Sequence, residues 1–189
     1  RRGIVVVTIN YRLNVFGFLC HPEITAENPE APANFGNLDQ QFATRWVQRN
    51  IAAFGGDPEN ITIGGQSAGG GSVMAQVTSP QNKGLFQKAI VDSGLMMTAY
   101  PGNMFGPDRS LSQVEKTGVE FFDFLGVSSL AEARKLDAVY LRDKAVEFKK
   151  HWGTVVDGKF CVGNANDLFM ANECQLVPMM FGHTATEFP

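Results

Sequence analysis

Short apolar runs alternate with amphipathic segments along the first hundred residues. Three of these runs, Ile4–Ile9, Ile61–Ile63 and Ala89–Val91, border on Gly, Asn or Asp, a pattern typical of strands buried on both faces. Leu176–Phe181 has a strand pattern as well and ends at Gly182. Strands that alternate with helices predict an α/β fold with a mostly parallel central sheet and helices on both faces.

Two helices are predicted between these strands. Residues 21–37 are rich in Pro, Asn, Glu and Ala without periodicity and are expected to form a loop. Asn37, with Gln40 three residues later, then gives a helix-capping signal, and the helix should end before Phe54. Its apolar stripe, with a spacing of four residues, consists of Leu38, Phe42 and Trp46. The other helix is expected to follow Ala68, with its apolar side chains at Val73, Met74 and Val77.

The pattern changes after residue 100. Residues 111–125 fit one long amphipathic helix ended by Gly126, and Ser129 with Glu132 gives a capping signal for another helix. We therefore expect one incomplete domain, 1–189, made of a core segment (1–99), a helical insertion (100–155) and a return to the core (156–189).

Composition excludes several classes of protein. The 189 residues are 44% hydrophobic, as in an ordinary folded domain, and 16 Lys+Arg against 19 Asp+Glu give a net charge of −3. The weak negative charge argues against a nucleic-acid partner, and no apolar stretch approaches the ~18 residues of a membrane span. Cys20, Cys161 and Cys174 are too few and too scattered for a disulfide scaffold or a zinc site, which weakly favours a reducing compartment such as the cytoplasm.

Residues 65–69, Gly-Gln-Ser-Ala-Gly, carry the most specific chemical pattern. G-x-S-x-G between a strand and a helix is typical of a nucleophile elbow, in which a strained turn exposes a serine hydroxyl. Gly on either side avoids a Cβ that would strike the adjacent strand or helix. The alternatives are a glycine-rich turn that only packs tightly and a phosphate-binding loop; the loop fails because neither the Walker A nor the dinucleotide spacing is met.

Several motifs around this pattern follow one another in a fixed order. They are NYRL (10–13), GFL (17–19), GNLDQ (36–40), RWVQ (45–48), NI (50–51), FGGDP (54–58) and GQSAG (65–69), followed by SG (93–94), VDG (156–158) and the segment from Val177-Pro178 to Glu187. Together they resemble the type-B carboxylesterases, the α/β-hydrolase branch that includes the cholinesterases, and in particular its bacterial-type members. The resemblance implies hydrolysis of small-molecule carboxylic esters through a Ser-Glu-His triad and an acyl-enzyme, with no cofactor and no metal.

The resemblance also implies roles for individual residues. Ser67 matches the nucleophile, the backbone N–H of Ala68 matches an oxyanion-hole donor, and Glu187 matches the triad acid. Asp92 is the rival acid, with capping of the turn at 93–94 as its alternative role. Gln66 stands where the family usually has Glu, which weakens the case for a cationic ester, and Thr186 and Phe188 also depart from the family pattern.

The triad histidine has no candidate in the required place. In this fold the order is Ser, acid, His, whereas His21, His151 and His183 all precede Glu187. The HGGG-type oxyanion loop is absent too. We therefore expect 1–189 to be an internal piece that is inactive without the remainder of its polypeptide or a companion chain. A non-catalytic interaction module of the same fold and an amidase or lipase variant of the same site stay open as alternatives.

Overall fold

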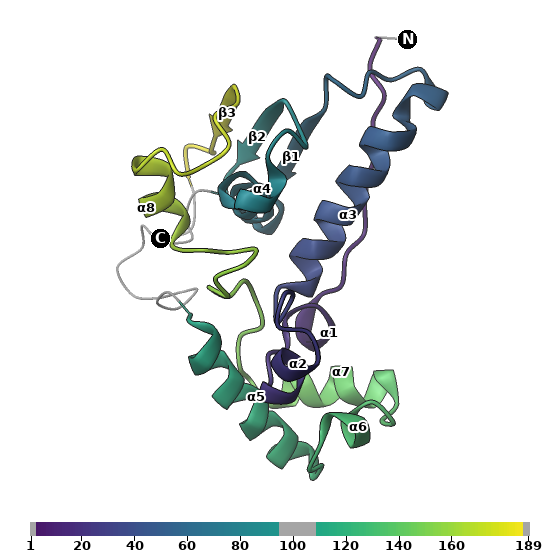
Figure 1. The fold of residues 1–189 in the computed structure, drawn as a ribbon, viewed down its shortest axis with the longest axis vertical. Helices are drawn as coiled ribbons and strands as arrows, with labels where there is room; N and C mark the ends of the chain where they lie inside the picture. Colours follow the sequence, from purple (N-terminus) through teal and green to yellow (C-terminus); the bar gives the residue numbers. More distant parts are fainter. Residues whose placement is uncertain (1–2, 95–108, 187–189) are drawn as a thin grey trace.

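The computed structural model describes residues 3–94 and 109–186. Figure 1 shows two regions joined by one long helix, α3 (Phe35–Asn50): a small sheet packed against a helix, and a group of helices at the other end. A short 3-10 turn, η1 (Ile51–Phe54), follows α3. A second one, η2 (Pro80–Asn82), follows α4 (Ala68–Thr78), the helix packed against the sheet.

Three parallel strands form the sheet, in the order β1 (Thr62–Gln66), β2 (Lys88–Asp92), β3 (Met179–Gly182). Their carboxyl ends are in register, so that Gln66, Asp92 and Gly182 lie side by side at one edge. The predicted α/β class with a parallel sheet is confirmed. The strand predicted over Leu176–Phe181 is confirmed too, although it pairs only from Met179 onward.

Helix α4 (Ala68–Thr78) covers one face of this sheet. The apolar residues predicted for this helix are buried. They pack with side chains of β2 and of the residues just before β1 and β2. The buried set is Ile61, Val73, Met74, Val77, Leu85, Phe86, Ala89 and Val91. A short helix, α8 (Ala165–Met170), lies against α4. Within 3–94 and 109–186 no helix makes comparable contact with the opposite face, so helices on both faces remain a prediction.

The strand predicted at Ile4–Ile9 is wrong. This segment forms no strand among the described residues, and the side chains of Ile4 and Val6 are 76% and 79% exposed. Figure 1 draws it as a trace without an arrow. A β-branched run favours a strand, but a strand forms only where a neighbour supplies its backbone hydrogen bonds, and no described strand lies beside this run.

The loop predicted over 21–37 is also wrong in part, because this stretch contains α2 (Pro22–Glu27); α1 (Asn14–Phe18) precedes it. Helix α3 begins at Phe35 rather than after Asn37, and Asn34 occupies its N-cap position with a left-handed φ of 61°. The predicted stripe faces outward, since Phe42 is 65% exposed. The buried face of α3 is polar instead, as described below.

Asn34 joins the start of α3 to a distant segment. Its side chain is fully buried; its Nδ2 donates to the Val155 carbonyl and to an Asp157 carboxylate oxygen, both at 2.8 Å, and its Oδ1 accepts from the Val155 N–H at 2.9 Å. Asn tolerates the left-handed region better than most residues, because its short amide can bond nearby backbone. These bonds hold the return segment against the N-terminus of α3.

The helices after residue 109 match the predicted pattern closely. Helix α5 (Leu111–Leu125) ends at Gly126, whose φ of 71° is left-handed, and Ser129 caps α6 (Leu130–Ala133) through the N–H of Glu132. Helix α7 (Ala138–Glu147) completes the group. Phe121 and Phe122 of α5 are buried against α1, α2 and α6.

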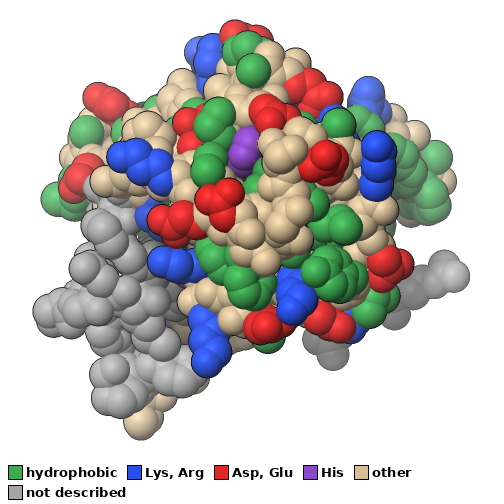
Figure 2. Space-filling model, turned by 90° about the horizontal axis from the view of Figure 1, so that it is seen from below, with side chains coloured by type: hydrophobic (Ala, Val, Ile, Leu, Met, Phe, Trp, Pro, Cys, Tyr) green, Lys and Arg blue, Asp and Glu red, His purple; other side chains and the backbone are tan. Residues whose placement is uncertain are grey.

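The surface of this helical end carries charges of both signs. Arg134 binds Glu27 with two hydrogen bonds of 2.8 and 2.6 Å, and Lys159 binds Glu30 at 2.9 Å. Figure 2, which views the molecule from this end, shows Lys and Arg interspersed with Asp and Glu over hydrophobic side chains. On the described part of this face the two signs are therefore mixed rather than separated into patches of one sign.

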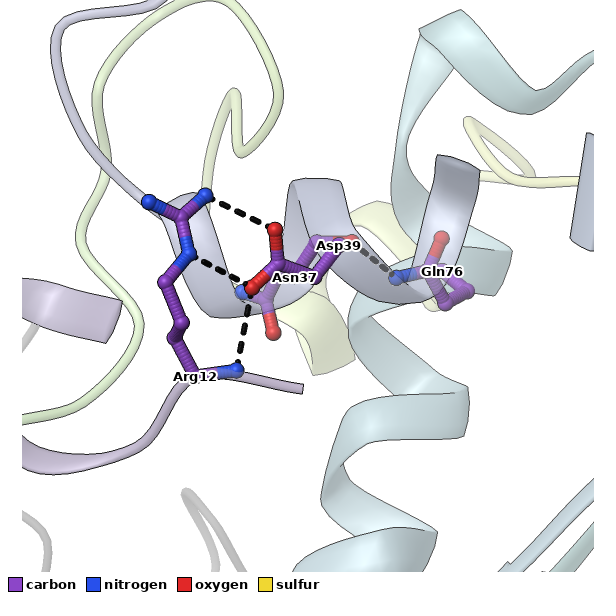
Figure 3. Close-up of polar contacts among 4 residues, drawn as sticks. All are labelled: Arg12, Asn37, Asp39 and Gln76. Atoms are coloured by element: carbon purple, nitrogen blue, oxygen red, sulfur yellow. Dashed lines mark hydrogen bonds and ion pairs between the residues drawn. The ribbon is translucent and has the colours of Figure 1, made fainter. Parts of the chain in front are cut away.

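Arg12 and Asp39 form an ion pair with three hydrogen bonds, shown in Figure 3. The Arg12 backbone N–H, Nε and Nη2 donate to the Asp39 carboxylate at 3.0, 2.8 and 2.7 Å. The side-chain hydrogen bonds from Arg12 lower the pKa of Asp39 below its usual value. A lowered folded-state pKa means that the pair stabilises the fold above the unfolded-state pKa of about 3.9 and that this contribution is lost as the pH falls through the folded-state value.

We therefore expect Asp39→Asn to lower the free energy of unfolding by up to about 1 kcal/mol at pH 7, because Arg12 is half exposed and solvent screens the pair. The difference from the parent protein should be smaller at about pH 2, because Asp39 is closer to protonation there. Urea unfolding at both pH values measures it. Asp143→Asn, which breaks a more exposed pair with Arg142, is the control and should change little. A loss at Asp39 that is the same at both pH values would contradict this electrostatic origin.

Candidate active site

Ser67 lies at the sharp turn between β1 and α4. Its φ of 54° and ψ of −119° place it outside the regions that non-glycine residues ordinarily adopt, a conformation that costs on the order of 1–3 kcal/mol. Two backbone hydrogen bonds hold it there: the Ser67 N–H donates to the Asp92 carbonyl at 2.9 Å, and the Ser67 carbonyl accepts from the Gly71 N–H at 3.0 Å. The side chain is exposed at the end of the sheet.

The turn needs a glycine at position 65. A Cβ built there would lie 2.3 Å from the backbone carbon and oxygen of Gly69. The expectation for Gly69 itself is wrong, because a Cβ at that position meets no described atom within 4 Å apart from its chain neighbours and the adjacent backbone of its own helix. Only Gly65 is therefore required to be a glycine by steric contact, because the backbone of Gly69 leaves no room for a side chain at residue 65.

If the full-length polypeptide has the expected esterase activity, Gly65→Ala should lower its kcat at least about 100-fold, since the clash is with backbone that cannot move without displacing Ser67. Gly64→Ala is the matched control, because its Cβ would meet Ile90 at an ordinary 3.6 Å. Ester turnover of the two variants, with circular dichroism to compare folding, measures the effect. Equal activity of both variants would show that the turn has room for a side chain.

The N-terminus of α4 points its first amides at the region of Ser67. The first N–H groups of a helix have no partner within the helix, and they carry the positive end of its dipole. Ala68, the first residue of α4, supplies one of these groups directly beside Ser67. The arrangement can stabilise negative charge that develops on an oxygen bonded to the serine.

The candidate acids follow the neighbouring strands. Asp92 ends β2 in register with Gln66, and its backbone carbonyl is the acceptor that holds the Ser67 N–H. The turn after it is held by the Ser93 N–H, which donates to the Gly182 carbonyl at 2.7 Å. Glu187 lies outside the described residues. Because β3 ends at Gly182, the segment that leads toward Glu187 starts at the same sheet edge as Ser67.

The three histidines lie in different surroundings. His21 is buried before α2, where its Nδ1 accepts from the Glu23 N–H at 3.2 Å and its ring stacks on Phe122 at 4.2 Å; burial lowers its pKa. His151 follows α7, away from the sheet elements in sequence. His183 follows β3, with its Nδ1 2.9 Å from the Thr184 carbonyl. Strands lie about 4.8 Å apart, so β3 stands about 10 Å from β1, beyond hydrogen-bond reach of Ser67 along the sheet edge.

Other kinds of site have no support in the part of the chain that the structure describes. No group of three His, Cys, Asp or Glu side chains there could hold a metal ion. None of the described helices is long and apolar enough to cross a membrane. Burial raises the pKa of the Cys20 thiol to about 12, so this cysteine is a packed side chain rather than a reactive thiolate.

The sequence profile of the carboxylesterase family matches residues 1–189. The chain belongs to the carboxylesterase family. The para-nitrobenzyl esterase of Bacillus subtilis is 41% identical over 140 residues, which is 74% of this chain and 26% of that protein. The mouse acylcarnitine hydrolase is 35% identical over 185 residues, covering 98% of this chain and 32% of that protein.

Solved structures agree with this assignment. The carboxylesterase of Geobacillus stearothermophilus, crystallised at pH 6.8, superposes with a TM-score of 0.78 at 34% identity, covering 93% of this chain and 37% of that one. Both the sequence and the structure comparisons therefore support an α/β-hydrolase fold over nearly the whole chain, and not only around residues 65–69. The chain spans about a quarter to two-fifths of the length of these relatives.

Proposed function

We propose that the polypeptide carrying this chain hydrolyses carboxylic esters with Ser67 as its nucleophile. The observation that carries the proposal is the φ of 54° at Ser67, on a tight turn between a parallel strand and the helix whose first amides flank it. Strained non-glycine residues persist where function requires them, and an exposed serine on such a turn is the arrangement that acyl transfer uses. Membership of the carboxylesterase family supports the same reaction class.

The reaction proceeds in two steps. Ser67 Oγ attacks the ester carbonyl while a histidine takes its proton, and the carbonyl π electrons move onto oxygen to give an oxyanion beside the Ala68 N–H. The oxyanion collapses, the alkoxide leaves with the proton from histidine, and an acyl-serine remains. Water then attacks the acyl-serine with the same histidine as base, which releases the acid and restores Ser67. Glu187 holds the histidine and stabilises its imidazolium form.

The proposed substrates are small, mostly uncharged esters. The neutral Gln66 beside Ser67 offers no negative charge to a cationic alcohol group. We propose that the histidine comes from outside residues 1–189. The positions of the described histidines, on a buried helix cap, after α7 and after β3, support this. We therefore propose that 1–189 needs the remainder of its polypeptide, or a companion chain, for turnover.

Labelling with a fluorophosphonate tests the function. The full-length polypeptide should form one adduct, located on Ser67 by mass spectrometry, and should hydrolyse p-nitrophenyl butyrate. Absence of both would favour a non-catalytic interaction module instead, whereas cleavage of anilides or long-chain triglycerides in preference to the butyrate would indicate the amidase or lipase variant. Residues 1–189 alone should show no turnover; Ser67-dependent turnover by them would refute the need for an outside histidine.

A further inference from the structure

The face that α3 turns toward α4 is polar although it is buried. Gln40 and Gln41 are each 4% exposed, and Gln76 on α4 is 5% exposed. Buried amides destabilise a fold unless they are hydrogen-bonded, and an apolar side chain would fill the same space without that demand. Burial of these amides therefore indicates that their hydrogen bonds have a role other than filling the space between the helices.

Gln40 bonds two successive turns of α4. Its Nε2 donates to Ser72 Oγ at 3.0 Å, and its Oε1 accepts from Gln76 Nε2 at 3.1 Å. Ser72 and Gln76 are four residues apart and so lie on one stripe of the helix. A single side-chain amide with a donor to one turn and an acceptor to the next adds a polar constraint on the rotation of α4 to the apolar packing of Val73, Met74 and Val77 on the sheet side.

The neighbouring contacts fix the partner helix in turn. Gln76 Nε2 also donates to the Asn37 carbonyl at 2.8 Å, while Arg12 binds Asp39 on another side of α3 (Figure 3). Asn82, after α4, donates to the Gln76 carbonyl and Oε1, both at 2.8 Å. These contacts hold α3 in place, and the bonds of Gln40 then couple the orientation of α3 to that of α4.

Few side chains hold the first turn of α4, although the backbone of Gly70 packs closely on Gly94. Residues 69–71 are three consecutive glycines, which contribute no side chains and have a low helix propensity, about 1 kcal/mol each below alanine. After Ala68, Ser72 is the first residue of the helix with a side chain. Ser67 lies directly before this turn and is bonded to it through the Gly71 N–H. The Gln40–Ser72 bond is therefore the first side-chain anchor after the candidate nucleophile.

We propose that Gln40 is a positioning residue for Ser67, acting through Ser72 and Gln76; this rests on the function proposed above. Gln40 touches no substrate, since it is buried between two helices. Its loss lets the glycine-rich turn shift, which moves Oγ and the Ala68 N–H away from the geometry that the reaction needs. Displacements of about 1 Å can lower a rate on the order of 100-fold.

Gln40→Met in the full-length polypeptide is the test, with p-nitrophenyl butyrate as substrate. We expect kcat to fall about 10- to 100-fold while KM stays within about twofold. The matched control is Gln41→Met: Gln41 has the same burial and donates to Asn82 Oδ1 at 2.7 Å, after α4 rather than on its first turns. It should lose similar stability in urea but keep kcat within about threefold.

A double variant separates positioning from general damage. Adding Ser72→Ala to Gln40→Met should lower kcat no further than Gln40→Met does, because both changes remove the same contact. Equal losses of kcat in Gln40→Met and Gln41→Met, or a parent-like kcat in Gln40→Met, would overturn the positioning role. A parent protein without Ser67-dependent turnover would instead refute the proposed function itself, and the positioning role with it.

Discussion

Replacing Ser67 with alanine should lower kcat for p-nitrophenyl butyrate by roughly 100,000-fold or more in the full-length polypeptide. Removal of a serine nucleophile leaves only the catalysis that binding and the oxyanion donors supply, and losses near a millionfold are typical of this change. Alanine accepts the backbone conformation about as well as serine does, and both backbone hydrogen bonds at residue 67 remain possible. Folding should therefore change little while turnover disappears.

Ser129→Ala is the matched control for this experiment. Ser129 also precedes a helix, α6, where its side chain accepts from the Glu132 N–H at 3.2 Å. Its replacement should lower stability by about 1 kcal/mol and leave kcat unchanged. Fluorophosphonate labelling of both variants gives a second readout, and persistent labelling after Ser67→Ala would assign the nucleophile to another residue.

If Glu187 is the triad acid as proposed, Glu187→Gln should lower kcat by roughly 10,000-fold, because an amide no longer selects the histidine tautomer or stabilises its imidazolium form. Asp92→Asn should stay within about threefold of the parent. The bond between Asp92 and Ser67 uses the backbone carbonyl, which the substitution leaves in place.

Steady-state kinetics of the two variants across pH 5–9 decide between the acids. A large loss in Asp92→Asn with a small one in Glu187→Gln would assign the acid to the end of β2 instead. Similar losses in both would indicate that two carboxylates share the task, and would contradict a single triad acid at 187.

The elements that the sequence could predict are those whose cause is local. The turn at Ser67 follows from a short strand, closely spaced glycines and an amphipathic helix, all within twenty residues. Helix α5 likewise ends at Gly126, because a left-handed residue suits a helix C-terminus. Family motifs then allowed roles to be expected for Ser67, Ala68 and Glu187.

The elements that it could not predict depend on distant partners. The apolar side chain of Phe42 is exposed and the amide of Gln40 is buried, because amides on α4 and after it pair with the polar face of α3. Hydrophobic spacing records which side chains favour burial, but it contains no information about which neighbour is present. The same limit explains why Ile4–Ile9 has a strand composition without a strand.

The polar residues of α3 carry a signal that local motifs do not explain. The spacing of Asn37 and Gln40 matches a helix-capping signal, whereas both residues lie inside α3 and bond other segments. A polar face at positions 37, 40, 41 of a helix could have indicated a buried amide network, since such residues share one side of the helix.

The bonds of Asn34 have a consequence for the order of folding. They join residues that are 121 positions apart in sequence, and closing so long a loop has an entropic cost that must be met before the contact contributes. Local helices such as α5 form on far shorter timescales. The start of α3 should therefore reach its left-handed geometry late, after the helices between the two segments have assembled. Loss of this contact would then act mainly by accelerating unfolding rather than by slowing the search for the fold.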